Sequence, residues 1–253
     1  MSKITDSVQE KINKWKAEPV LSLAHHFHKF NKQQHVRVSE YTVSDLSTVK
    51  KNWNTMKKIT IHLGLNNEKQ TNDNVITFAP IFEIDGKYLE MEIITKQDKN
   101  MLKTNNGARV PEEYKEMVTY NWNTLDFHLI DDLFIVRDNG IPKRVTSYHN
   151  SGAVITALKE LIPDSSKLNA INMYLGVDKN KFAIPSLTAF APVIGFQYMT
   201  VKDPKKNPVI SYFINSGNVA CKKIDSEIEE GVIKSIFSLE FFMQYTSPCP
   251  PTC

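Results

Sequence analysis

Ile59-Thr-Ile-His-Leu-Gly64 is the stretch that decides the fold, because its pattern returns at Ile171-Asn-Met-Tyr-Leu-Gly176. Fourteen residues after each glycine stands the same tripeptide, Phe78-Ala79-Pro80 in the first place and Phe190-Ala191-Pro192 in the second. Both anchors are separated by the same distance along the chain (176 − 64 = 112 and 190 − 78 = 112). A constant spacing without a gap indicates an internal duplication.

The match extends beyond these anchors. Residues 43–82 and 155–194 share eight identities in forty positions, where composition alone predicts roughly two or three. From residue 113 onward the spacing slips to 114, as a small difference in loop length would produce. The alternative is that two α+β segments of similar pattern align by accident.

Each copy is predicted to fold as a helix, three strands and a helix. In the first copy a helix follows Ser44, strands run over 58–65, 75–84 and 87–95, and Pro111 opens the closing helix. Three strands joined by short connections are antiparallel. The expected fold class is therefore α+β: a tandem pseudo-twofold duplication of an α-β-β-β-α unit, with antiparallel sheets covered by helices. The copies either share one sheet or pack as two sheets.

The second copy is predicted to repeat this order. Its strands are expected over 168–177, 187–201 and 209–214, followed by a closing helix that starts near Asp225 and carries Ile236 and Leu239. The glycines that both copies share are expected to provide either a bulge or a close approach of two backbone segments near a strand end. The shared prolines lie in the second predicted strand and indicate a sheet edge or a bulge.

These patterns divide the chain into four parts: an N-terminal helical extension over 1–34, repeat unit 1 over 35–137, repeat unit 2 over 138–246 and a Cys/Pro tail over 247–253. The extension is predicted as two helices, the second of which runs from Pro19 through Phe30. Neither helix has a counterpart in the second copy, so both are expected to be an addition that packs on the repeat core.

Composition limits the classes of function. The chain has 253 residues, of which 41% are hydrophobic, enough for a packed core. Only four of its 31 basic residues are arginine and the net charge is +3, so nucleic acid is not an expected partner. The N-terminus carries no apolar signal region, and no membrane span is expected. We therefore expect a cytoplasmic protein that is a monomer or a small homo-oligomer.

Histidine and tyrosine supply the candidates for ligand binding. The chain has no glycine-rich phosphate loop, no nucleophile elbow and no dinucleotide fingerprint. His62 alternates out of phase with the apolar residues of its predicted strand, and its equivalent in the second copy is Tyr174. His128 and His149 are the further candidates. No catalytic residue is assigned.

Metal binding has candidates at both ends of the chain. His25 and His28 share one face of a predicted helix, and Cys249 and Cys253 lie in the proline-rich tail. Their Cys-x3-Cys spacing differs from the Cys-x2-Cys of zinc ribbons. No cofactor is expected, with zinc or another transition metal as the alternative. An inert tail and a redox or modification handle are the other interpretations.

Three functions remain open at this stage. We favour a non-catalytic binding or assembly module, with a protein partner or a small ligand at the seam between the copies, because the residues that both copies share are apolar, Gly and Pro. The second is an enzyme whose site is built asymmetrically from His and Tyr residues of the two copies. The third is a metal-binding protein that uses the His helix and the Cys tail.

Overall fold

The computed structural model describes residues 3–31, 34–66, 76–94, 112–138, 140–182, 188–201, 210–215, 218–223, 236–244 and 247–249. Its α-helices and 3₁₀ helices are α1 (Lys3–Ala17), η1 (Val20–Phe27), α2 (Ser47–Asn52), α3 (Glu112–Thr124), η2 (Phe127–Leu129), η3 (Asp131–Phe134), α4 (Ala153–Leu161), η4 (Ser165–Lys167) and η5 (Lys179–Lys181). Its strands are β1 (His28–Asn31), β2 (Gln34–Arg37), β3 (Glu40–Val43), β4 (Lys58–His62), β5 (Ile81–Ile84), β6 (Lys87–Ile93), β7 (Ile135–Asp138), β8 (Ile141–Arg144), β9 (Ser147–Ser151), β10 (Leu168–Tyr174), β11 (Val193–Val201), β12 (Ile210–Asn215), β13 (Asn218–Lys223), β14 (Ile236–Gln244) and β15 (Ser247–Cys249).

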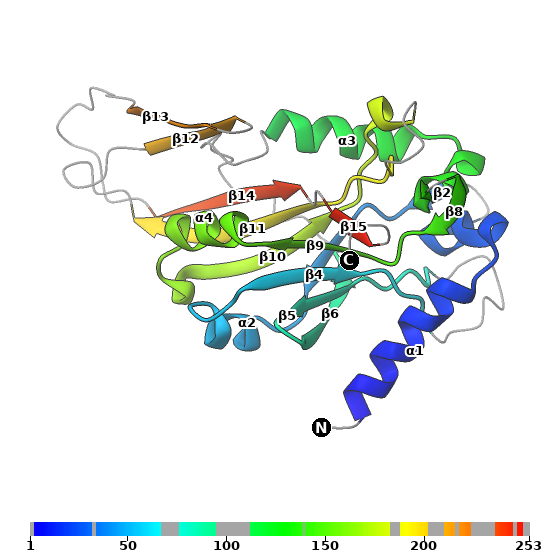
Figure 1. Ribbon diagram of the computed structural model, residues 1–253, viewed down its shortest axis with the longest axis horizontal. Helices are drawn as coiled ribbons and strands as arrows, with labels where there is room; N and C mark the ends of the chain where they lie inside the picture. Colours follow the sequence, from blue (N-terminus) through cyan, green and yellow to red (C-terminus); the bar gives the residue numbers. More distant parts are fainter. Residues whose placement is uncertain are drawn as a thin grey trace.

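Nine strands form one antiparallel sheet in the order β14-β11-β10-β3-β6-β5-β4-β9-β15 (Figure 1). The two ends of this order, β14 and β15, follow each other in the chain with only residues 245–246 between them. The sheet therefore curls back on itself. The predicted α+β class and the antiparallel pairing are confirmed, and the candidate copies contribute to one sheet rather than two.

The two halves of the chain, residues 3–94 and 112–249, pair with each other at two places in the sheet. Strand β3 of the first half pairs with β10, where Thr42 lies opposite Asn172. Strand β9 of the second half pairs with β4, where Tyr148 lies opposite Ile61. The same two strands also pair with β6 and β15 of their own halves. The first-half strands β3, β6, β5 and β4 are consecutive in the sheet order, so the two halves join edge to edge at β3–β10 and β4–β9.

Two helices cover the outer face of the curled sheet. Val8 and Ile12 of α1 pack against Ile81 of β5, and Val118 of α3 packs against Tyr174 and Val193. Figure 1 shows α1 at the lower right and α3 along the top. Within the described ranges, no helix is long and apolar enough to cross a membrane.

The inner face holds the main core. Alternate residues of the central strands, such as Ile59 and Ile61, are fully buried there. Helices α2 and α4 contact each other through Trp53, whose Nε1 donates to Ile162 O at 2.8 Å. Six buried aromatic residues contact one another in this core: Trp15, Phe27, Phe78, Trp122, Phe134 and Phe190.

Contacts of the first half recur in the second half at a constant spacing. Trp15 Nε1 donates to Val145 O at 2.8 Å, and Trp122 Nε1 donates to Val38 O at 2.9 Å. The two donors and the two acceptors stand at the same spacing along the chain (122 − 15 = 107 and 145 − 38 = 107). Trp15 thus anchors α1 to the segment before β9, and Trp122 anchors α3 to the segment before β3. In both cases the helix and the segment belong to different halves.

Two arginines make a second reciprocal pair of contacts. Arg37 donates to the carbonyl oxygens of Trp122 and of Leu125, the latter at 2.7 Å. Arg144, its counterpart at the spacing of 107 (144 − 37 = 107), donates to the carbonyl oxygens of Trp15 and Glu18 at 2.8 and 2.5 Å. Because the last carbonyls of a helix lack partners within it and favour a cation, each arginine caps the helix of the opposite half.

The shared glycines stand where two backbone segments meet, as predicted. Gly64 O accepts a hydrogen bond from Ala79 N at 2.9 Å, and Gly176 O accepts one from Ala191 N at 2.8 Å. A Cβ atom would lie 2.9 Å from Ala79 O at the first glycine and 2.6 Å from Ala191 O at the second. Both contacts exclude a side chain. The shared prolines precede β5 and β11 rather than interrupting them.

The hairpin turn at Asp85-Gly86 is present, with φ of 45° and 81°, as type I′ geometry requires. It joins β5 to β6. The matching strands of the second half, β11 and β14, are joined by residues 202–235, which contain the separate hairpin β12–β13. The second half therefore carries an insertion where the first half has a tight turn.

Two predicted helices are wrong. The helix expected through Phe30 ends at Phe27, because His28–Asn31 pairs with Gln34–Arg37 as a hairpin. The closing helix expected to carry Ile236 and Leu239 is strand β14 at those positions, and it pairs along its whole length with β11. Tertiary pairing overrides the local pattern in both places. The second half consequently does not end as the α-β-β-β-α unit predicts.

Candidate functional site

A pocket of about 230 Å³ lies between α1, the segment before β5, and strands β3 and β6. It adjoins the seam between the halves, because β3 is the strand of the first half that pairs with β10 of the second. Its lining combines apolar side chains with two carboxylates, an amide and an ammonium group. The lining residues are Lys11, Tyr41, Asn66, Ile76, Phe78, Ala79, Pro80, Ile81, Glu90, Met91, Glu92 and Ile93.

Backbone hydrogen bonds fix the wall of this pocket. Asn66 N donates to Thr77 O at 2.8 Å, and Leu65 forms an antiparallel bridge with Phe78. The hydroxyl of Tyr41 donates to Phe78 O at 3.2 Å. Complete burial raises the pKa of Tyr41, so its hydroxyl keeps its proton and remains a donor. The wall over residues 76–78 is thus held from two strands.

The rim of the pocket carries charge. Lys11 Nζ lies 2.5 Å from Glu90 Oε1, and this ion pair joins α1 to β6. The next outward residue of β6 is Glu92, which is exposed. Within the described ranges no ion pair or hydrogen bond neutralises its carboxylate. The described lining residues therefore carry one negative charge in excess, from two carboxylates and one ammonium group.

A second polar group lies on the outer face of the same half. His62 Nε2 lies 2.5 Å from Glu83 Oε2, and the two side chains are 19% and 17% exposed. The hydrogen bond from His62 lowers the pKa of Glu83 against the effect of burial. The ring of Tyr88 lies 5.7 Å from that of His62, and burial, with the charge of Glu83, raises the pKa of Tyr88. A carboxylate and an imidazole at this distance can hold a proton between them.

His149 lies on the neighbouring strand. It pairs with Thr60, and its neighbour Ser147 pairs with His62. Burial lowers the pKa of His149, and the charge of Lys58 lowers it further. Its Nδ1 atom is buried, and no described residue forms a hydrogen bond with it. The structure thus brings His62 and His149, two of the candidate ligand-binding residues, onto adjacent strands.

The other two candidates lie elsewhere. Tyr174 ends β10, whereas His62 belongs to β4. Strands β3, β6 and β5 lie between these two strands in the sheet order. The ring of Tyr174, like that of Phe242, lies beneath the ammonium group of Lys115, at 5.2 and 5.1 Å. His128 belongs to η2, where its ring contacts Phe127 at 5.6 Å. A shared pocket for His62 and Tyr174 is therefore not formed.

Of the candidate metal ligands, the structure brings together His25 and His28, whose rings both lie 5.0 Å from that of Phe127. His28 Nδ1 contacts Ala24 O at 2.7 Å, and its Nε2 accepts from Arg37 at 2.7 Å, so both ring nitrogens are engaged. His25 packs edge-on against Phe127 at 5.0 Å. No group of three or more His, Cys, Asp or Glu side chains in the described part of the chain is placed to hold a metal ion.

The backbone of Cys249 belongs to β15 and pairs with Ser147, whose partner on its other side is His62. Cys253 lies outside the described residues. The tail is therefore joined to the sheet at the strand beside His62.

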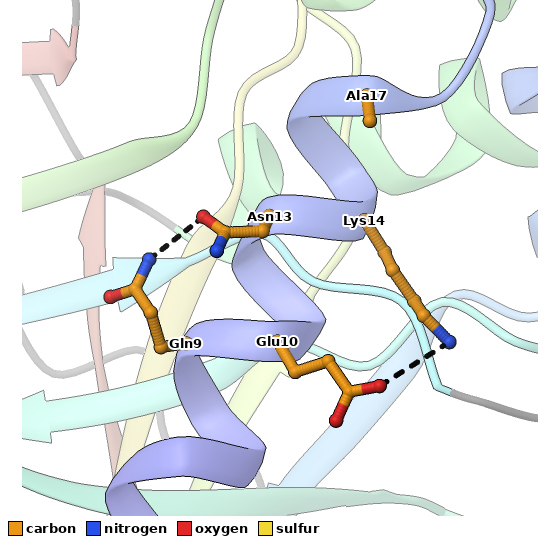
Figure 2. A pocket seen from close by; sticks show the side chains of 5 residues that line it. All are labelled: Gln9, Glu10, Asn13, Lys14 and Ala17. Atoms are coloured by element: carbon orange, nitrogen blue, oxygen red, sulfur yellow. Dashed lines mark hydrogen bonds and ion pairs between the residues drawn. The ribbon is translucent and has the colours of Figure 1, made fainter.

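A larger hollow of about 490 Å³ lies over α1 (Figure 2). Its described lining comes from this helix alone, where Gln9 donates to Asn13 at 2.9 Å and Lys14 lies 3.8 Å from Glu10. These are ordinary contacts on the exposed face of a helix. One wall without convergent groups does not define a site, so this hollow carries no functional argument.

Sequence reasoning missed the residues that build the pocket and its surroundings. Lys11, Glu90 and Glu92 come from separate segments, and no motif connects them. One signal was present: Arg37-Val38-Ser39-Glu40-Tyr41 matches Arg144-Val145-Thr146-Ser147-Tyr148 at a spacing of 107. That match marks β3 and β9, two strands at the seam between the halves, and it would have located Tyr41 there.

Comparison of the chain with protein-family models, with curated proteins and with solved structures found no match. The chemistry of the residues themselves carries the functional argument.

Proposed function

We propose that this chain is a non-catalytic binding module whose ligand occupies the pocket beside α1, on a scaffold made of two tandem copies of one unit. The observation that carries the proposal is the pocket, which combines apolar residues such as Ile76 and Phe78 with the carboxylate of Glu92, for which the described residues supply no cationic partner. It adjoins β3, one of the two strands at the seam.

Recurring contacts support the duplication. The tryptophan and arginine contacts recur at a spacing of 107, and the bridges Leu65–Phe78 and Val177–Phe190 recur at 112. The first copy then begins with α1 and the second with α3, so residues 1–34 belong to the first copy rather than preceding it. The second copy therefore has five more residues than the first between these two sets of contacts (112 − 107 = 5). They fall in the region of α2 and α4, and α4 is the longer of these helices.

The pocket favours a small ligand with an apolar body and one cationic group. Its volume of about 230 Å³ is below the ~300–1,000 Å³ that is usual for drug-sized ligands. The excess negative charge at the rim attracts a cation, and the aliphatic and aromatic lining favours burial of hydrocarbon. A short alkylammonium ion satisfies both requirements.

The test uses hexylamine as the probe and hexanol as its uncharged match. Titration followed by amide NMR should shift the resonances of Asn66, Phe78 and Glu92 with the amine and much less with the alcohol. In Glu92→Gln the binding of the amine should weaken several-fold, because the carboxylate that attracts it is gone. Glu113→Gln, an exposed site on α3, serves as the matched control.

Equal shifts with both probes would assign the pocket to apolar ligands. Absence of shifts at these three residues with either probe would remove the pocket as the binding site.

One observation favours the enzyme alternative, namely the short contact between His62 and Glu83. A general acid–base site needs such a pair within hydrogen-bond reach of substrate. Hydrolysis of p-nitrophenyl acetate by the protein, abolished in His62→Ala and retained in His128→Ala, would favour catalysis over binding.

A further inference from the structure

His26 connects the pocket wall to the buried end of α1. It belongs to η1 and is 7% exposed. Its Nδ1 lies 2.5 Å from the hydroxyl oxygen of Thr77, and its carbonyl oxygen accepts from the amides of Thr77 and Phe78 at 3.2 and 3.1 Å. One residue thus makes three hydrogen bonds to the segment that lines the pocket.

The other side of the ring faces a carboxylate. His26 Nε2 lies 3.1 Å from Glu18 Oε1 without the alignment of a full hydrogen bond, and Glu18 also accepts from the hydroxyl of Ser22 at 2.7 Å. The other charged groups that act on the ring are His25 of η1 and Arg144 of β8. Both oppose a positive charge on His26, whereas Glu18 favours it.

The second half has no such arrangement. The residue that corresponds to His26 at the spacing of 107 is Leu133 (133 − 26 = 107). Its carbonyl oxygen accepts from the hydroxyl of Thr188 at 2.6 Å, but its side chain cannot titrate. The corresponding wall of the second half is therefore held by bonds that pH does not change. Of these two equivalent positions, only the one beside the pocket carries a buried imidazole.

We propose that His26 is a proton-operated latch, which holds the wall at residues 76–78 while its ring is neutral and releases the wall when the ring takes up a proton. In the neutral ring, the proton lies on Nε2, the nitrogen on the side of Glu18, and Nδ1 accepts from the Thr77 hydroxyl. Protonation turns Nδ1 into a donor, so the Thr77 hydroxyl must give up its own donation to the ring. The latch itself does not depend on the proposed function; its effect on ligand binding does.

Linkage gives the direction of the effect. Burial is the main cause that lowers the pKa of His26, and an opened, hydrated wall restores the ordinary value of about 6.5. The opened state then binds protons more tightly than the closed state, so acidification below that value favours opening. Glu18, whose pKa is also lowered, adds an effect in the same direction only below its own ordinary range of about 4.3.

Amide hydrogen exchange on the full chain tests the latch. After correction for the intrinsic rate, protection of the Thr77 and Phe78 amides should fall several-fold between about pH 7 and about pH 5.5, where imidazole titrates and carboxylates do not. The amide of Phe190, which donates to the Thr188 hydroxyl at 3.2 Å, should not change. In His26→Gln, a polar side chain that does not titrate, the pH dependence should disappear.

An equal loss of protection at Phe78 and Phe190, or an unchanged pH dependence in His26→Gln, would overturn the latch. Hexylamine titrations at both pH values separate the two proposals. A latch that responds to pH in a protein that never binds the amine would retain the latch and remove the pocket ligand. His26→Leu, which copies Leu133, is the second variant if the glutamine variant does not fold.

Discussion

Phe27 and Phe134 stack against each other in the core, with their ring planes 5° from parallel and their centroids 5.5 Å apart. They stand at the spacing that relates the two tryptophans (134 − 27 = 107), and their carbonyl oxygens accept from Val38 N and Val145 N at 3.0 and 2.8 Å. Equivalent positions of the two halves thus meet ring to ring. If the halves are copies, the axis that relates them passes between these rings.

The two tryptophans should contribute similarly to stability although they lie in different helices. Trp122→Phe removes the donor to Val38 O and leaves a buried carbonyl without its partner, which costs about 1–3 kcal/mol. Trp15→Phe does the same to Val145 O. Urea unfolding should show both losses. A change no larger than that of Leu21→Ala, whose side chain is 85% exposed, would contradict the role of these hydrogen bonds.

The arginine caps should act on the opposite half. Arg37→Met removes the donors to the end of α3, and Arg144→Met removes those to the end of α1. Each variant should lose about 1.5–3 kcal/mol, as for hydrogen bonds from a charged group. Hydrogen exchange should locate the loosened helix end in the half that does not contain the substitution.

Arg137→Met is the matched control for both arginine variants, because Arg137 is exposed on β7. Loosening confined to the half that carries the substitution would contradict the exchange of caps.

The two shared glycines should differ in their tolerance of alanine. A Cβ at Gly176 would lie 2.6 Å from both Ala191 O and Val118 Cγ2, whereas at Gly64 the nearest side-chain atoms are 3.2 Å away. Gly176→Ala should therefore cost more than Gly64→Ala, with about 1–3 kcal/mol expected for such overpacking. Thermal unfolding gives the ranking.

Gly140→Asn is the control for the glycine variants. Its surroundings are open and its φ is +80°, a conformation that asparagine tolerates. The reverse ranking, or no loss in either alanine variant, would show that the backbone moves aside at these positions.

The contact of Glu83 with His62 predicts part of the acid sensitivity. The pKa of Glu83 is lowered in the folded protein, so the folded state binds its proton less tightly than the unfolded state. The stability that this gives is present above the ordinary value of about 4.3 and is lost as the pH falls through the lower folded value. In Glu83→Gln the free energy of unfolding should fall less steeply in this range. Glu113→Gln should retain the slope of the parent protein.

Local pattern was sufficient for some elements and not for others. The alternation of Ile59, Ile61 and Leu63 predicted β4, and the Asp85-Gly86 turn predicted the β5–β6 hairpin, because each signal lies within a few residues. Strand β3 has only four residues, and its partner β10 belongs to the other half of the chain. No local pattern contains that pairing.

The candidate site was predictable only in part. His62 could be assigned to a strand, but its contact with Glu83 and its closeness to His149 depend on the strand order. The spacing of 107, carried by Trp15 and Trp122, is hidden from a comparison at 112 because additional residues around α4 shift the register. Lys11 and Glu90 meet only through the packing of α1 on the sheet.

The pairing of β3 with a strand of the second half also affects how the protein can form during its synthesis. Thr42 must wait for its partner Asn172, which belongs to the second half of the chain and emerges from the ribosome much later. Until then β3 exposes one edge without a hydrogen-bonding partner, and such an edge invites association with other chains. Pairings at this sequence separation also form slowly, because the loop must close before the contacts compensate for its entropy. The chain is thus most prone to association, and most in need of chaperones, while only its first half has been synthesised.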